Sequence, residues 1–474
     1  MKHRWQGTLT LLLAALVGAC GGGDKKVVAP GGGDGTGGAV APGPGADKPV
    51  VDEGPTAEDT LAWVLATVAS GQVEQAEVER RFSPGFLKQV PAAQVVQIFA
   101  ALKEQLPPVT VLKQDGTAPL KLAALLDTAA GGLRVSITMT SATPRQIDGL
   151  LFAPATSEAP PRTYPDAVAQ LEKAGAKAQL FVAEVDQGAC VPKLNVNTTT
   201  SLATGSTFKL WVLLALDEKL ATSKGKLTWD TTLPIRDEAK SLPSGTMQDE
   251  AAGTTHTLRE FATQMISISD NTATDHLIDY VGDAGVEKAL KLAKHTNPAA
   301  NTPFLRTREL FGLKLAASPE DLAGYRKASV AAKRKMLATM RTAPIDLTRI
   351  NDWMTGTPRA LDLEWFADGR DLCNVMATLG TRGKWDPTSP LLTILSKNPG
   401  LPFDAAQWSY LGFKGGSEPG VMNLTFLGKR SDGKWFVVVA AVNDDAKGVD
   451  ESLVVNAATG VLRILGAEAA PAAP

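Results

Sequence analysis

The chain has 474 residues, which is too long for one ordinary domain, so two folded domains are expected. Hydrophobic residues make up 44% of the sequence and charged residues 21%, which is ample material for packed cores. The formal net charge is −2 and no basic stripe stands out, so a nucleic-acid role has little support.

The first 20 residues resemble an export signal. Lys2, His3 and Arg4 form a positive start, an apolar run follows from residue 9 to residue 17, and small residues precede Cys20. The run is shorter than the roughly 20 residues of a membrane-spanning helix. This pattern is similar to a bacterial lipobox, which implies that Cys20 is lipidated and that the protein is an exported, membrane-anchored lipoprotein facing the periplasm or the cell exterior. The alternatives are a plain cleavable signal or an uncleaved anchor.

The remaining cysteines are Cys190 and Cys373. Export permits a disulfide between them, but sequence cannot show that they are close, and two separate buried thiols are the favoured interpretation. The four histidines form no H-E-x-x-H arrangement, and the cysteines form no C-x-x-C arrangement. No metal and no cofactor are implied.

Two segments have compositions that do not support a packed core. Residues 21–54 consist mainly of Gly, Ala, Pro, Asp and Lys, and we expect a flexible tether there. The Ala- and Pro-rich tail, residues 468–474, is expected to be unstructured as well.

Residues 55–156 are expected to form a small α+β domain. Thr56 and Asp59 are typical of a helix N-cap, and the following apolar residues line one helical face. A second helix is expected at Ala92–Gln105, and alternation over 133–139 indicates a half-buried strand. The domain weakly resembles cystatin or NTF2-type modules, and we see no chemistry in it.

Residues 157–467 are expected to form a second, larger domain. It begins with a helix near Pro165–Ala174 and a strand at Gln179–Val185. Two further strands surround the turn at residues 431–434, and a closing helix is expected at Glu451–Leu465. Strands at both ends imply an antiparallel sheet whose first and last segments meet.

The first chemical motif is Ser206-Thr207-Phe208-Lys209, an S-x-x-K sequence. Two other S-x-x-K sequences occur beside glycines in expected turns, whereas Ser206 opens a long apolar segment. Residues three apart on a helix share a face, so Lys209 can reach the Ser206 hydroxyl and act as its base. The helix N-terminus also offers N–H groups where an oxyanion would form. The alternative is a capping serine on a core helix.

The second motif is Ser269-Asp270-Asn271, between two apolar-periodic stretches, and an inter-helix turn is expected there. Ser269 could pass a proton between Lys209 and a leaving group. The Asn271 side chain could orient Lys209 and bind a substrate carbonyl. An Asx-type turn with Asn271 as a helix cap is the structural alternative.

The third motif is Lys414-Gly415-Gly416, which follows an alternating stretch and is expected to end that strand. Its glycines would let a substrate lie against the strand edge, and the Ser417 N–H could complete an oxyanion hole with that of Ser206. A second cation near Lys209 would help to keep Lys209 neutral. The alternative is a Gly-rich hairpin turn.

These motifs, their order and the 63 residues from Ser206 to Ser269 resemble the class A β-lactamases among the penicillin-recognising serine hydrolases. The resemblance covers about residues 165–466 and implies an α+β fold with an antiparallel sheet flanked by helices and an all-helical lobe. It implies that Ser206 is the acylated nucleophile, Lys209 a base and Ser269 a proton relay. Lys414 would be a carboxylate or charge anchor, and Asn271, Gly416 and Ser417 would bind the substrate.

The chain departs from that family pattern in three places. Gly415 stands where the family usually has a hydroxyl residue, and Met422 and Asn423 stand where an arginine is expected. For the deacylating glutamate the nearest candidate is Glu309, but the usual R-x-E spacing is missing. Glu309 could equally be a helix residue paired with Arg306 or Arg308, which is the favoured interpretation. A further helix is signalled at residues 318–321.

The sequence therefore predicts an exported serine hydrolase that acts through an acyl-enzyme, with β-lactamase-type hydrolysis of a β-lactam amide and a part in antibiotic resistance. An esterase or peptidase of the same fold, with weak β-lactam turnover, is the alternative. A non-catalytic lipoprotein that binds peptidoglycan is the alternative of another class. The expected partners are a small amide or ester substrate and, through the lipid, a membrane, and we expect a monomer.

Overall fold

The computed structural model describes residues 54–88, 90–116, 119–129, 131–341, 353 and 357–468. The predicted export signal with Cys20, and the predicted tether up to residue 53, lie outside the described residues, as does the tail from residue 469 onward. None of the described helices is long and apolar enough to cross a membrane.

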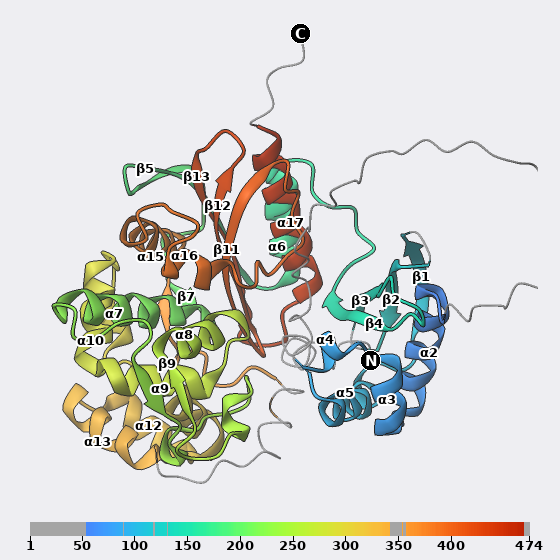
Figure 1. Ribbon diagram of the computed structural model, residues 1–474. Coiled ribbons are helices and arrows are strands. Elements are labelled where there is room, and N and C mark those ends of the chain that lie inside the picture. The colour runs from blue at the N-terminus through green and yellow to red at the C-terminus, as the bar shows by residue number, and fades with distance from the viewer. Residues whose placement is uncertain are drawn as a thin grey trace, which may run out of the picture.

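The N-terminal part has helices followed by a four-stranded antiparallel sheet, in the order expected from the sequence (Figure 1). Thr56 and Asp59 form the expected capping box, and the helix that they start buries Leu61, Val64 and Val68 in a core separate from the rest of the molecule. The elements are α2 (Ala57–Ser70), α3 (Gln75–Arg81), α4 (Pro84–Leu87), α5 (Ala92–Gln105), β1 (Thr110–Asp115), β2 (Lys121–Thr128), β3 (Gly131–Met139) and β4 (Ile147–Pro154).

A five-stranded antiparallel sheet in the order β11-β12-β13-β5-β6 forms the centre of the remaining chain. The last strand along the chain pairs with the first, so the predicted meeting of the two ends is confirmed, as is the turn at residues 431–434. The strands are β5 (Lys177–Asp186), β6 (Ala189–Val196), β11 (Trp408–Glu418), β12 (Val421–Arg430) and β13 (Trp435–Asn443).

Helices cover both faces of this sheet (Figure 1). Because side chains alternate along a strand, Leu180 and Val182 of β5 pack on the side of α6 and α17, whereas Phe181 and Ala183 join the core that includes α7 and α15. The covering helices are α6 (Tyr164–Ala174), α17 (Glu451–Ala467), α15 (Gly369–Arg382) and α16 (Pro390–Ser396). This arrangement confirms the predicted α+β class.

A helical lobe is inserted between β6 and β11. Its α12 begins at the capping box of Ser318 and Asp321, where a further helix was predicted. The lobe contains α7 (Lys209–Thr222), α8 (Leu258–Ser267), α9 (Asn271–Val281), α10 (Asp283–Leu292), α11 (Thr307–Phe311), α12 (Pro319–Lys327), α13 (Val330–Met340) and the short strand pairs β7 (Leu202–Ala203) with β10 (Phe366–Ala367) and β8 (Thr232–Pro234) with β9 (Thr255–Thr257).

Cys190 and Cys373 form a disulfide, with their Cα atoms 6.3 Å apart. The interpretation of two separate buried thiols is therefore wrong. Cys190 lies on the edge strand β6 and Cys373 lies on α15, which packs against that strand. The pairing depends on a tertiary contact between residues 183 positions apart, which the sequence does not reveal.

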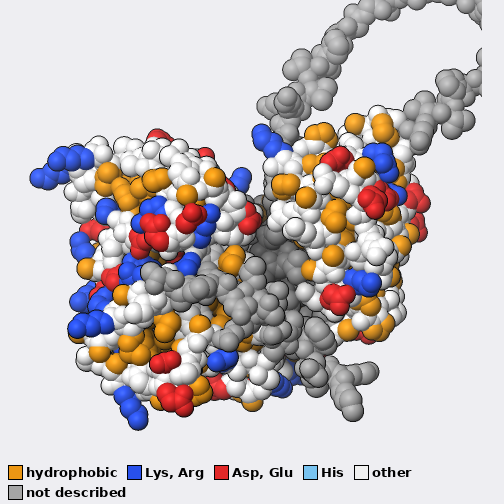
Figure 2. All heavy atoms as spheres, turned by 90° about the horizontal axis from the view of Figure 1, so that it is seen from below, with side chains coloured by type: hydrophobic (Ala, Val, Ile, Leu, Met, Phe, Trp, Pro, Cys, Tyr) orange, Lys and Arg blue, Asp and Glu red, His pale blue; other side chains and the backbone are white. Residues whose placement is uncertain are grey.

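Figure 2 shows Lys and Arg side chains interspersed with Asp and Glu side chains on one face of the molecule.

Candidate active site

Ser206 lies in a 3₁₀ turn, η2 (Gly205–Phe208), between β7 and α7. A backbone contact of the residue two positions before Ser206 and a side-chain contact of the residue after it hold this turn in place. The Thr204 N–H donates to the Trp365 carbonyl at 2.9 Å, and the Thr207 hydroxyl donates to Asn423 Oδ1 at 3.1 Å. The residues around Ser206 are buried, whereas Ser206 itself is partly exposed. The fold thus presents one hydroxyl group from a fixed turn.

Lys209 is fully buried at the start of α7 and points toward the second motif. Its Nζ lies 3.0 Å from Ser269 Oγ, 2.6 Å from the Ser269 carbonyl oxygen and 2.7 Å from Asn271 Oδ1. Burial and, secondarily, the nearby charge of Lys414 hold the pKa of Lys209 well below its usual range. A neutral amine at this position can accept a proton.

The second motif lies in the predicted turn between α8 and α9. Ser269 has a left-handed backbone conformation, with φ of 60°, and its hydroxyl oxygen lies 3.1 Å from Lys414 Nζ. Both lysines therefore reach the same hydroxyl group. Asp270 is the N-cap of α9, because its carboxylate accepts the Ala273 N–H at 2.7 Å. Asn271 is the first residue of α9, so the predicted capping role belongs to its neighbour.

A loop at residues 242–247 supports this turn, and sequence reasoning missed it. Asn271 Nδ2 donates to the Leu242 carbonyl at 3.1 Å, and the Ser244 hydroxyl donates to the Ser269 carbonyl at 2.6 Å. The Asp270 carboxylate also accepts the N–H groups of Thr246 and Met247, at 2.7 and 2.9 Å. These contacts hold the Asn271 side chain so that its oxygen faces Lys209.

The third motif lies inside β11, not at its end, so the prediction that Lys414-Gly415-Gly416 ends the strand is wrong. The strand continues to Glu418, with each motif residue paired to β12, and the turn comes afterwards. Two glycines are typical of a turn, but here the strand uses them for close packing. Burial lowers the pKa of Lys414 to about 7.

Gly416 packs directly against the turn that carries Ser206. A Cβ atom at this position would lie 2.1 Å from the Thr204 carbonyl oxygen and 2.5 Å from the Ser206 nitrogen. A Cβ on Gly205 would likewise lie 2.9 Å from the Ser417 nitrogen. The backbones that carry the Ser206 and Ser417 N–H groups are therefore in contact, as two donors to one oxyanion require.

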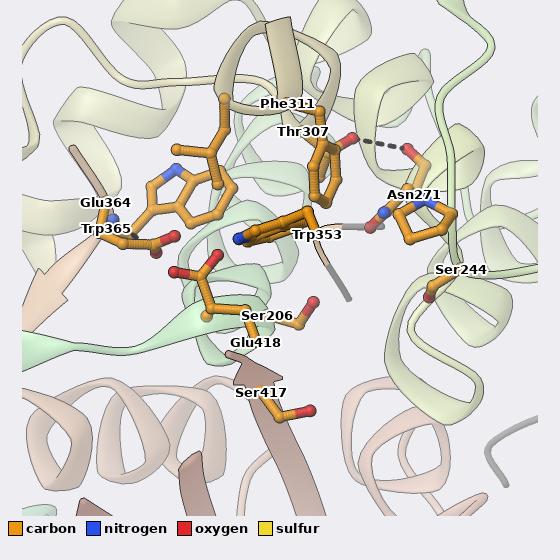
Figure 3. A pocket seen from close by; sticks show the side chains of 13 residues that line it. Ser206, Ser244, Asn271, Thr307, Phe311, Trp353, Glu364, Trp365, Ser417 and Glu418 are labelled. Carbon is orange, nitrogen blue, oxygen red and sulfur yellow. Dashed lines mark hydrogen bonds between the residues drawn. The ribbon is translucent and has the colours of Figure 1, made fainter. Parts of the chain in front are cut away.

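A small pocket opens at Ser206 (Figure 3). Apolar and aromatic side chains share its wall with a few polar groups. The lining residues are Gly205, Ser206, Pro243, Ser244, Asn271, Thr307, Leu310, Phe311, Trp353, Glu364, Trp365, Ser417 and Glu418.

Glu309, the candidate for the deacylating base, is not among the residues that line this pocket. Its carboxylate is fully buried, accepts the Arg306 N–H at 2.8 Å and pairs with the Arg341 guanidinium. The Arg306 guanidinium lies 3.6 Å away, which confirms the predicted pairing with Arg306. Arg308 instead donates to the Lys240 carbonyl at 2.6 Å. Glu309 thus serves as part of the capping box of α11.

Three buried charged residues near Ser206 were missed by sequence reasoning. Lys314 lies in the π-helical turn η6 (Gly312–Ala316), and its Nζ is 2.8 Å from Glu364 Oε1 and also contacts Glu418 Oε1. Glu418 could have been noticed, because it lies four residues after Lys414 on a strand and so shares its face. Glu364 and Lys314 carry no local signal of this kind.

Two family models match the chain. Residues 164–366 match the model described as Beta-lactamase enzyme family, a range that includes Ser206, Lys209, Ser269 and Asn271 but ends before Lys414. Residues 53–143 match the model described as ORF 12 gene product N-terminal. The resemblance of the N-terminal part to cystatin or NTF2-type modules stays a prediction. No curated protein matches the chain significantly.

Several solved structures are similar to the chain. The beta-lactamase from Sphaerobacter thermophilus DSM 20745 is 20% identical, with 64% of this chain and 97% of that chain covered and a TM-score of 0.43. PBP-A is 18% identical, with 65% and 98% covered and a TM-score of 0.40. The beta-lactamase from Francisella tularensis is 14% identical, with 65% and 100% covered and a TM-score of 0.43.

Proposed function

We propose that the protein is a serine hydrolase that forms an acyl-enzyme on Ser206 and hydrolyses the amide of a β-lactam ring. Residues 164–366 match the family model described as Beta-lactamase enzyme family, which supports this proposal. One observation carries this proposal: Lys209 and Lys414 both contact the Ser269 hydroxyl, next to a fixed turn that presents Ser206. An amine and a hydroxyl group in such contact can exchange a proton, which the activation of a serine nucleophile needs.

In the proposed acylation, neutral Lys209 takes the Ser206 hydroxyl proton while Oγ bonds to the carbonyl carbon of the substrate. The negative charge that develops on the carbonyl oxygen is stabilised by the N–H groups of Ser206 and Ser417. The Ser269 hydroxyl then carries a proton from Lys209 to the leaving nitrogen as the C–N bond breaks. The transfer from Lys209 to Ser269 runs along a contact of 3.0 Å between Lys209 Nζ and Ser269 Oγ.

Lys414 has two roles in this proposal. While protonated, it donates to Ser269 Oγ and orients that hydroxyl group, and its charge helps to keep Lys209 neutral. It also supplies the positive charge that would attract a carboxylate of the substrate. Asn271 holds Lys209 through its side-chain oxygen and lines the pocket, where it is available to a substrate.

The test of this proposal is covalent labelling. Intact-protein mass spectrometry after exposure to benzylpenicillin should show an adduct on the wild-type protein and none on Ser206→Ala. Nitrocefin should then be hydrolysed with repeated turnover. Absence of an adduct with both penicillin and a fluorophosphonate would refute a serine hydrolase, and retention on peptidoglycan without serine reactivity would favour the non-catalytic alternative.

A second candidate is an esterase or peptidase of the same fold. Gly415 provides no hydroxyl group beside Lys414, and within the described strand β12 the positions expected to carry an arginine hold Met422 and Asn423. Met422 is buried in the core, and Asn423 accepts the Thr207 hydroxyl, so neither supplies a charge for a carboxylate. A higher kcat/KM for a simple acyl ester than for nitrocefin would favour this candidate.

We also propose that Cys20 carries a lipid and that the protein is held at a membrane after export. The support is the lipobox-like sequence that precedes Cys20. Metabolic labelling with a radioactive or clickable palmitate, compared between wild-type protein and Cys20→Ser, tests this proposal.

A further inference from the structure

A buried ionic cluster lies in the wall of the Ser206 pocket. The exposed fractions are 0% for Lys314, 3% for Glu364 and 7% for Glu418. Lys314 donates to both carboxyl groups, so the two carboxyl groups share one ammonium group. Figure 3 shows the Glu418 carboxyl group pointing toward Glu364. The cluster joins three segments that are far apart in sequence.

For this cluster to be electrically neutral, one of its two carboxyl groups must carry a proton. One ammonium group can balance one buried carboxylate, and a second unbalanced carboxylate would be costly to bury. Two carboxyl groups that bind the same ammonium group lie close together and do not both ionise readily, because each charge opposes the other. Burial and the neighbouring Glu364 raise the pKa of Glu418 well above its usual range. The pair therefore holds one proton and one negative charge, and it can both accept and return a proton.

The position of the pair follows from the two-residue period of β11. Lys414, Gly416 and Glu418 share one face of the strand. Gly416 contacts the Ser206 backbone, and Lys414 reaches Ser269 on one side of it. Glu418 lies two residues beyond Gly416 on the other side, which is about 7 Å along a strand. Ser206 thus lies between the two lysines of the acylation machinery and the carboxyl pair.

The same pocket holds Ser206 and the pair, whereas it does not include the glutamate that the sequence suggested. Among the described residues that line it, Glu364 and Glu418 are the acidic ones. Glu309 is engaged by Arg306 and Arg341 outside that lining. An ester on Ser206 would therefore face the same pocket as this pair.

We infer that the Glu364–Glu418 pair, held by Lys314, is the general base that activates water for release of the acyl group from Ser206. This inference rests on the proposed function. The water oxygen bonds to the acyl carbon, and one water proton passes to the carboxylate of the pair. The bond from the acyl carbon to Ser206 Oγ then breaks, and Oγ takes a proton from the pair. The products are the free acid and the serine hydroxyl, and the pair again holds one proton.

The experiment separates acylation from deacylation in Glu364→Gln and Glu418→Gln. Each variant is mixed with benzylpenicillin, the adduct is counted by intact mass, and loss of the adduct is followed after removal of free penicillin. Because the adduct forms only on molecules with an assembled site, its decay is measured on folded protein. We expect near-stoichiometric adduct in both variants, with deacylation at least 100-fold slower than in the wild type, as loss of a general base requires.

Glu309→Gln is the matched control, since it also removes a charge from a buried, ion-paired glutamate. Its deacylation rate should stay within threefold of the wild type. Wild-type deacylation rates in Glu364→Gln and Glu418→Gln, or slow deacylation in Glu309→Gln alone, would overturn the inference while leaving the acyl-enzyme proposal intact. Absence of an adduct on the wild-type protein would instead refute the proposed function itself.

If either glutamine variant forms no adduct, Glu364→Asp and Glu418→Asp replace them. These variants keep the charge and withdraw the carboxyl group by one methylene. Acylation should be retained and deacylation should slow, because the base no longer reaches the water at the same distance. Unchanged deacylation in both aspartate variants would overturn the inference.

Discussion

Gly416→Ala tests whether close packing between β11 and the nucleophile turn orients Ser206. The added Cβ would lie 2.1 Å from the Thr204 carbonyl oxygen, 2.5 Å from the Ser206 nitrogen and 2.7 Å from the Thr207 nitrogen. All three atoms belong to the backbone, so no side-chain rotation can relieve the contact. The turn and the strand must instead move apart.

The size of the shift follows from these distances. Real Cβ atoms essentially never approach another atom within 3.0 Å, so the contact with the Thr204 oxygen must lengthen by about 0.9 Å. This movement separates the Ser206 and Ser417 N–H groups that would bind the oxyanion. A misplacement of about 1 Å can cost roughly 100-fold in rate. We therefore expect acylation to slow by about 100-fold, or about 2.7 kcal/mol in activation free energy.

The assay is the second-order rate of acylation by benzylpenicillin, followed by intact mass on a millisecond-to-minute scale. Gly415→Ala is the control on the same strand, because its Cβ would meet the end of the Phe413 ring at 2.7 Å and its nearest neighbours include no atom of the turn that carries Ser206. It should slow acylation much less. An acylation rate for Gly416→Ala within fivefold of the wild type, with the variant folded by thermal melting, would refute the reasoning.

Three further predictions concern the disulfide, the second lysine and the anchor. Replacing Cys190 and Cys373 with Ala should lower the free energy of unfolding in urea by about 5 kcal/mol, because the bridge spans 183 residues; a change below about 1 kcal/mol would contradict this. Lys414 is charged below its pKa of about 7 and neutral above it, so acylation by penicillin should fall as the pH rises through about 7. Lys414→Arg should abolish that fall, since arginine keeps its charge, and an unchanged profile would exclude Lys414 as its cause. Cys20→Ser should move the protein from the membrane fraction to the soluble fraction, and an unchanged distribution would argue against a lipid on Cys20.

The sequence predicted the elements that depend on local signals. The capping box at Thr56 and the helix Ala92–Gln105 are found as expected, because caps and periodicity are encoded within a few residues. The pairing of β5 with β13 was also predictable, since apolar strands at the two ends of a domain can both be buried when they pair in one sheet. Contact between Lys209 and Ser269 followed from the motifs alone.

Other features depend on packing between distant segments, and sequence reasoning missed them or described them wrongly. The two glycines after Lys414 were expected to end a strand, whereas they allow β11 to approach the Ser206 turn. The disulfide between Cys190 and Cys373 depends on where α15 packs against β6. In both cases the local sequence is compatible with two structures, and contact with a distant segment determines which of them forms.

The register of β11 links the two halves of the proposed reaction. Because side chains alternate, Lys414, Gly416 and Glu418 must face the nucleophile together or not at all. A shift of the strand register by one residue would turn all three residues to the opposite face of the sheet. The pairing of Gly416 with Asn423 therefore determines where these residues lie, in addition to stabilising the sheet. Asn423 also accepts the Thr207 hydroxyl, which ties the nucleophile turn to the strand that fixes this register. In the proposed reaction, one hydrogen-bonded ladder thus positions both Lys414, which assists acylation, and Glu418, which assists deacylation. A change that disturbs the ladder should slow both steps, whereas a change at Glu364 should slow only the second.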